Sequence, residues 1–110
     1  MTYAISSYKY IKLIVGFSIL KDKDYNYIID SLAKLADEII VTKIKDNPRA
    51  FDTDELYSLV KDKGKEVIEI EDPIEAYEYS KKLANEDDLV LWCGSLYLVG
   101  DILKHEKAPR

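Results

Sequence analysis

The sequence is poor in the residues from which catalytic and metal sites are usually built. Among 110 residues it has one cysteine, Cys93, and one histidine, His105, which lies in a charged tail (104–110). A Ser-His-Asp triad, a Cys-His pair or a histidine-rich metal site cannot be assembled from this inventory. A lone cysteine also excludes an internal disulfide and, with no export signal in the sequence, we expect a reducing cytoplasmic compartment.

Glycine is scarce too, and long apolar runs are missing. The four glycines are widely spaced, which excludes a glycine-rich loop of the P-loop or dinucleotide-binding type. No apolar run approaches the ~20 residues that a membrane span needs. The net charge is −5 and the lysines are scattered, which argues against nucleic acid or an anionic membrane as the main partner. The length fits one domain, residues 1–110.

Short apolar runs alternate with helical patterns four times along the chain. The runs predict strands at 11–17, 38–42, 66–70 and 89–93, the third nearer a sheet edge because its residues alternate. Helices are predicted to start at Asp24, at the capping box Asp52-Thr-Asp-Glu55, at Asp72-Pro73 and at Ser95. Gly64 is predicted to end the second helix in a left-handed conformation.

This alternation predicts a three-layer α-β-α domain. We expect a Rossmann-like, mainly parallel sheet of four or more strands with helices on both faces. Residues 1–10 are either a frayed lead-in or the remnant of a preceding helix. Their tyrosines, Tyr3, Tyr8 and Tyr10, are candidates for a bared apolar surface, so self-association of the isolated domain is possible.

Ligands of such a sheet bind beyond the carboxyl ends of its strands, and three connections leave those ends with distinctive chemistry. In the longest one, Pro48 fixes the backbone of Asp46-Asn-Pro-Arg49, and a guanidinium on a rigid turn suits a carboxylate. Asn47 could add a donor or an acceptor. The plainer interpretation is a solvated loop in which Asp46 and Arg49 pair with each other or with water.

The other two connections are equally open to a plain interpretation. Gly94-Ser95 offers free backbone N–H groups at a helix start, which attract anions, or is an ordinary N-cap after a buried strand. Lys21-Asp22-Lys23 could present lysines to a phosphate, or is a solvated turn before a helix. Cys93 is a small packed residue and no nucleophile, because no base accompanies it.

Three stretches together resemble one family. Val15-Gly-Phe-Ser-Ile-Leu-Lys-Asp-Lys-Asp24, Asp46-Asn-Pro-Arg-Ala50 and Gly94-Ser-Leu-Tyr-Leu-Val-Gly100 occur in the order and spacing of one known domain. The domain that they resemble is the C-terminal domain of folylpolyglutamate synthase/dihydrofolate synthase, in the Mur ligase superfamily. The resemblance runs from about Lys12 to Leu103.

The resemblance implies an ATP-driven ligase that joins glutamate to a folate through an acyl phosphate. It implies glutamate contacts at Asn47 and Arg49, further contacts at Gly94 and Ser95, and a nucleotide-facing turn at Lys21, Asp22 and Lys23. ATP and Mg²⁺ would belong to the complete enzyme, held mainly by a central ATPase domain that would be the partner of this one. No metal ligand and no catalytic residue is expected in this chain.

Departures from the family pattern leave a rival interpretation open. The family's Asp-Gly-Ala-His-Asn-Pro segment is absent, and Cys93 stands where threonine is more usual. The chain is thus either part of a longer enzyme, inactive in isolation, or a stand-alone binding or interaction domain that kept the fold without the ligase chemistry. An unrelated flavodoxin-like module would have to match three motifs by chance.

Overall fold

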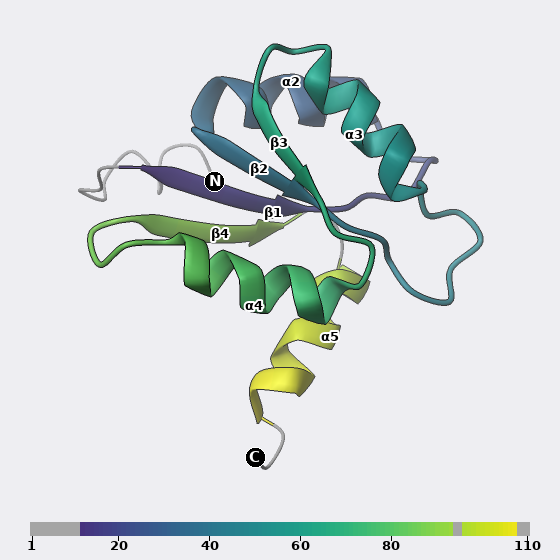
Figure 1. The fold of residues 1–110 in the computed structure, drawn as a ribbon. Helices are drawn as coiled ribbons and strands as arrows, with labels where there is room; N and C mark the ends of the chain where they lie inside the picture. The colour runs from purple at the N-terminus through teal and green to yellow at the C-terminus, as the bar shows by residue number, and fades with distance from the viewer. Residues whose placement is uncertain (1–11, 94–95, 108–110) are drawn as a thin grey trace.

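The computed structural model describes residues 12–93 and 96–107 as an open parallel sheet between helices (Figure 1). The strands are β1 (Leu13–Phe17), β2 (Glu38–Val41), β3 (Glu66–Glu69) and β4 (Leu89–Cys93). The helices are α2 (Tyr25–Leu35), α3 (Thr53–Lys61), α4 (Pro73–Leu83) and α5 (Leu96–Lys107). The strand order is β3-β2-β1-β4, and every pairing is parallel. The predicted three-layer α/β fold is confirmed.

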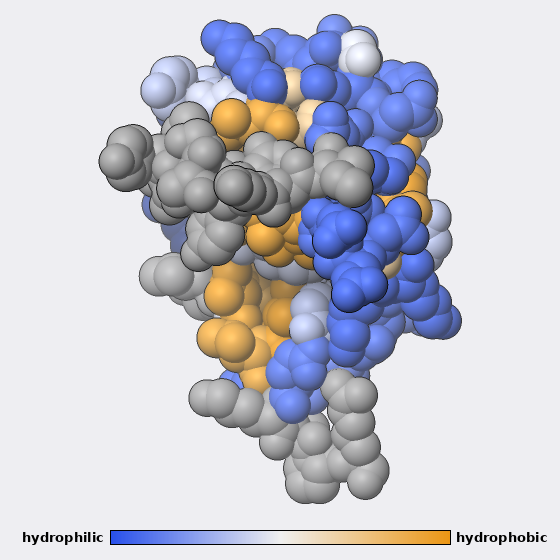
Figure 2. Space-filling model, turned by 90° about the vertical axis from the view of Figure 1, so that its left-hand side faces the viewer, coloured by the Kyte–Doolittle hydropathy of each residue, from blue (hydrophilic) through white to orange (hydrophobic). Residues whose placement is uncertain are grey.

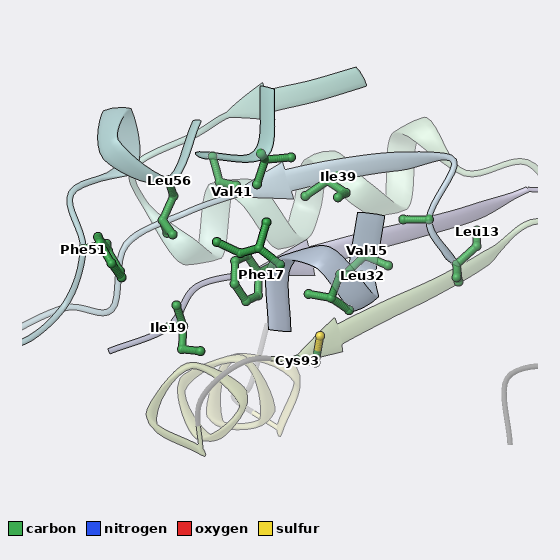
Figure 3. Packing of buried hydrophobic residues seen from close by; sticks show 13 residues of the cluster. Leu13, Val15, Phe17, Ile19, Leu32, Ile39, Val41, Phe51, Leu56 and Cys93 are labelled. Carbon is green, nitrogen blue, oxygen red and sulfur yellow. The ribbon is translucent and has the colours of Figure 1, made fainter. Parts of the chain in front are cut away.

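β1 is the central strand and is buried on both faces. Its side chains alternate, so that Leu13, Val15 and Phe17 join one apolar cluster while Ile14 joins another. The first cluster fills the space between the sheet and the pair α2 and α3, with Phe17 near its centre (Figure 3). A strand buried on both faces cannot alternate polar and apolar residues, which is why the segment reads as a continuous apolar run.

The opposite face of the sheet packs on α4. Ile14 and Ile40 contact Ala76 of this helix, and the partly buried Trp92 of β4 packs against them. A third cluster lies beyond the strand ends, where Leu98 and Ile102 of α5 pack with residues of two connecting loops, namely Leu20, Ile44 and Ala50. These loops are therefore anchored by apolar contacts as well as by the strands they follow.

Most of the predicted helix signals hold. Asp52 precedes α3, and its backbone N–H donates to Glu55 Oε1 at 3.3 Å, the returning half of the capping box. Pro73 is the first residue of α4. Gly64 adopts the predicted left-handed conformation (φ 79°), but α3 ends earlier, at Lys61, and two turn residues separate the two.

The capping prediction for Asp24 is wrong in its chemistry. Asp24 does occupy the N-cap position of α2, but its side chain makes no capping hydrogen bond. The first turn is closed instead by the backbone, since Ile28 N–H donates to Asp24 O at 3.2 Å. The carboxylate of Asp24 is therefore a solvated charge at the helix start, where it still interacts favourably with the helix dipole.

The two outer strands differ in character. β3 lies at the sheet edge, as predicted, but its burial does not alternate, because Glu66 and Glu69 are exposed and the two residues between them are half-buried. β4 is the other edge among the described residues, and Leu89 to Trp92 are all partly exposed. Seen from the left-hand side of Figure 1, a vertical strip of apolar surface is exposed (Figure 2). Tyr3, Tyr8 and Tyr10, predicted to bare such a surface, lie outside the described residues, and self-association stays a prediction.

No helix in the described ranges has both the length and the apolar character needed to cross a bilayer.

Candidate functional site at the carboxyl end of the sheet

The predicted ligand edge is the carboxyl end of the sheet, where β1, β2 and β4 end. Phe17, the last residue of β1, is paired with Val41 of β2 on one side and with Cys93 of β4 on the other. The connections that follow Phe17 and Val41 therefore leave the sheet from the same edge (Figure 1). Strand order reverses between β1 and β4, and this kind of switch point is where open α/β sheets bind ligands.

The Asp46–Arg49 turn is shaped by its own polar side chains. Asp46 has a left-handed backbone (φ 57°), a conformation that aspartate tolerates better than most residues. Asn47 Oδ1 accepts the Arg49 N–H at 3.0 Å, and Asn47 O accepts the Ala50 N–H at 3.1 Å. Asn47 thus builds the turn that presents Arg49, a structural role that the sequence interpretation did not include.

The turn is also tied to the loop that follows β1. Lys21 N–H donates to Arg49 O at 2.7 Å, next to an antiparallel bridge between Leu20 and Ala50. Leu20 and Ala50 are both buried in the cluster that α5 completes. Two of the three predicted site segments, Lys21–Lys23 and Asn47–Arg49, are therefore brought together on one anchored platform.

The two segments also meet through their side chains. Arg49 Nη1 donates to Asp22 Oδ2 at 2.7 Å, and about half of each side chain is exposed to solvent (55% and 48%). The plain interpretation of the sequence paired Arg49 with Asp46 or with water, and the structure instead selects Asp22. Nothing local in the sequence indicates this pair, because 27 residues separate its members.

Basic residues around the platform are mostly engaged with acidic ones. Lys21 Nζ lies 3.6 Å from Glu55 Oε1 and 5.8 Å from the centre of the Phe51 ring. Lys43 Nζ lies 3.1 Å from Asp52 Oδ1, and this hydrogen bond raises the pKa of Lys43. Lys23, the third residue of the predicted nucleotide-side turn, is exposed.

A shallow hollow of about 310 Å³ lies beside the platform. Its lining carries charges of both signs, from Lys43, Lys45, Asp46, Glu71 and Asp72. Lys45 Nζ lies 2.8 Å from Asp72 Oδ1, and the ammonium lowers the pKa of that carboxyl group. The lining thus carries two cationic and three anionic side chains, and Arg49 stands at its side on the turn that Asp46 begins.

The end of β4 offers no nucleophile. Cys93 is 8% exposed, and burial raises the pKa of its thiol to about 11, so the thiol is protonated at neutral pH. Gly94 and Ser95, predicted as ligand contacts, lie outside the described residues, although they directly follow Cys93. On the β1 side of the switch point, the buried Ser18 hydroxyl has no hydrogen-bond partner among the described residues.

Among residues 12–93 and 96–107, no three histidine, cysteine, aspartate or glutamate side chains are grouped so as to hold a metal ion.

The fold and the site together define the class of protein. It is a three-layer α/β domain that presents an arginine at the carboxyl edge of its sheet. The sequence model of the Mur ligase glutamate ligase domain matches residues 1–96. The chain belongs to this family.

Individual relatives agree with the family assignment. The chain is 38% identical over 96 residues to the dihydrofolate synthase/folylpolyglutamate synthase of Bacillus subtilis (strain 168), covering 87% of this chain and 22% of that protein. The E. coli FolC structure in complex with ADP superimposes with a TM-score of 0.86 at 19% identity, over 96% of this chain and 25% of that one. The structure of the folylpolyglutamate synthase of Thermotoga maritima superimposes with a TM-score of 0.66 at 33% identity. This match covers 84% of this chain and 20% of that one.

The resemblance inferred from the three motifs is thereby confirmed. The chain spans about a quarter or less of the length of these relatives.

Proposed function

We propose that this chain is the C-terminal amino-acid-binding part of an ATP-dependent ligase that adds glutamate to a folate. The observation that carries the proposal is the placement of Arg49. Its guanidinium stands at the carboxyl edge of the sheet, on a turn held by Asn47 and by the Lys21 backbone. Glutamate has two carboxylates, and a planar guanidinium binds a carboxylate through two parallel hydrogen bonds.

The remaining predicted contacts complete the amino-acid site. Asn47 uses its side-chain oxygen to shape the turn, which leaves the amide NH₂ as its donor toward a substrate carboxylate. Gly94 and Ser95 directly follow Cys93, the last residue of β4, in the sequence, and backbone N–H groups at a helix start favour an anion. We assign glutamate binding to Asn47, Arg49, Gly94 and Ser95.

The nucleotide would approach from the Lys21–Lys23 turn. Solved relatives are described as complexes with ADP, and the Yersinia pestis enzyme as a complex with AMPPNP and a Mn ion. Lys21 and Lys23 are both exposed and could meet a phosphate. The described residues do not fit a metal ion, since they offer no group of three ligands, so metal and most of the nucleotide would be held by the ATPase domain of the complete ligase.

The test is steady-state kinetics of the complete ligase with Arg49→Lys, each substrate varied in turn. Lysine keeps the charge but loses the two-pronged geometry. Losing a charge-assisted hydrogen bond costs about 1.5–3 kcal/mol, which corresponds to a roughly ten- to hundredfold rise in the glutamate KM. The KM values for ATP and folate should change little.

A matched control is Lys61→Arg, an equally conservative exchange of an exposed basic residue on α3. It should leave all three KM values unchanged. If Arg49→Lys behaved like Lys61→Arg, Arg49 would be a solvated loop residue, and the amino-acid site would have to be sought around Gly94 and Ser95.

A further inference from the structure

We propose that Asp22 is a positioning residue for the amino-acid site, acting through Arg49. This inference rests on the proposed function and reassigns Asp22, which the family resemblance places on the nucleotide side. The observation behind it is the ion pair in which Arg49 Nη1 donates to Asp22 Oδ2 at 2.7 Å. In this arrangement Asp22 affects the binding of glutamate and has no direct part in holding the nucleotide.

The backbone fixes the distance between the two residues. Lys21, the immediate neighbour of Asp22, donates its N–H to the carbonyl of Arg49 itself, and Leu20 is bridged to Ala50. Most exposed ion pairs are weak, because two long side chains must lose freedom in order to meet. Here the backbones are already joined and aspartate is short, so only the arginine side chain has to be ordered.

One side of the guanidinium is thereby committed and the rest remains available. A guanidinium has five N–H groups in a planar fork, and among the described residues its side-chain acceptor is Asp22 Oδ2, which Nη1 contacts. A carboxylate can therefore still bind along another edge of the same plane. Since Asp22 restricts the rotation of the plane, the arginine is oriented before substrate arrives, which lowers the ordering cost of binding.

The charge of Asp22 has a second consequence. A lone arginine at this edge would attract any anion, including the phosphates of a nucleotide. With Asp22 in contact, part of the positive charge is neutralised, and a ligand must supply a geometry that matches the remaining N–H groups. We therefore infer that Asp22 shifts the preference of Arg49 from phosphate toward a planar carboxylate.

The chain offers a matched pair of variants for the test. Asp22→Asn and Asp24→Asn make the same charge change two residues apart in the same turn, and the Asp24 side chain makes no capping hydrogen bond. In the complete ligase, Asp22→Asn should raise the glutamate KM by about two- to fivefold, the range that an exposed ion pair corresponds to. Asp24→Asn should not, and Asp22→Glu should restore part of the loss.

Two further readouts separate positioning from a general loss of structure. For Asp22→Asn, kcat at saturating glutamate and the KM for ATP should stay at the parent values. In an Arg49→Lys background, Asp22→Asn should have a much smaller effect on the glutamate KM, because the guanidinium through which Asp22 acts is already missing. In the 110-residue chain, NMR signals of the Arg49 guanidinium should change with Asp22→Asn and not with Asp24→Asn.

The outcomes distinguish this inference from the proposed function. If Arg49→Lys leaves glutamate kinetics intact, the proposed function fails. If Arg49→Lys is damaging while Asp22→Asn matches Asp24→Asn, only the positioning role is overturned. A fall in the glutamate KM with Asp22→Asn would also overturn it, since Asp22 would then be a competitor that substrate must displace.

Discussion

The indole ring of Trp92 lies over Gly16 of the neighbouring strand. The two residues are register partners of β4 and β1, and a methyl group built on Gly16 would run into three carbon atoms of the indole. Trp92 Nε1 donates to Ser80 Oγ on α4 at 3.2 Å, and Tyr77 packs edge-on against the indole at 6.1 Å between ring centres. The absence of a side chain at Gly16 therefore allows the central strand, the edge strand and α4 to pack together.

Gly16→Ala should destabilise the domain. The added methyl group must push against a ring that a hydrogen bond and a second aromatic residue hold in place, and overpacking of this kind typically costs about 1–3 kcal/mol. Urea or thermal unfolding measures the loss. Gly100→Ala in α5 is the matched control, because its new methyl group meets no atom within 4 Å.

The control should move in the opposite direction. Alanine is better than glycine inside a helix by roughly 0.5–1 kcal/mol, so Gly100→Ala should leave the free energy of unfolding unchanged or raise it. Equal losses for the two variants would show that the Trp92–Gly16 contact is not the cause.

Asp37 closes a gap in the hydrogen bonding at the start of β1. Its Oδ2 accepts the backbone N–H of the fully buried Leu13 at 2.7 Å, while Asp37 N–H donates to Leu13 O at 2.8 Å. Asp37→Ala would leave the Leu13 N–H without this acceptor, at a cost of about 1–3 kcal/mol. Asp37→Asn keeps a side-chain oxygen and should lose less. Unfolding free energies that rank the two variants the other way would refute this role.

Regular elements could be predicted well from the sequence because their signals are local. β4 begins and ends as predicted, and β2 and β3 each end one residue before the predicted limit. Apolar runs, caps and Pro73 lie within a few residues of the structure they specify. Gly64 predicts the end of α3 three residues too late, because the helix ends at Lys61 and Gly64 is the left-handed residue of the turn that follows.

The candidate site could be predicted only in part, because its contacts are not local. The strand order brings together the loops of Asp22 and Arg49, but no spacing in the sequence reveals which carboxylate the arginine meets. Asn47 was expected to face a ligand, and its oxygen proves to be needed by the backbone of Arg49. The need for glycine at position 16 could not be predicted, because the indole of Trp92 that lies over it belongs to a strand far away in the sequence.

Cys93 should react slowly with thiol reagents in the native protein. Because burial raises the pKa of its thiol to about 11, the thiolate is scarce at pH 8. The folded state disfavours the thiolate, so this residue's contribution to stability is present below the unfolded pKa near 9 and is lost as pH rises toward 11. Labelling with a chromogenic disulfide should be far faster in denaturant. Fast labelling of the folded chain at pH 8 would contradict the burial of Cys93.

The 110-residue chain alone should neither hydrolyse ATP nor ligate glutamate. Phosphoryl transfer needs a cradle for the phosphates and a metal ion that offsets their charge. The four glycines are too widely spaced in the sequence for a phosphate-binding loop, and the described residues hold no group of three metal ligands. At the carboxyl edge of the sheet, Lys43, Lys45 and Arg49 are each paired with an aspartate, which weakens the attraction of these cations for a triphosphate.

The measurement is phosphate release by the purified chain with Mg²⁺, folate and glutamate. A metal-dependent, folate-stimulated activity that an Arg49→Lys substitution abolishes would show that the catalytic machinery lies within this chain.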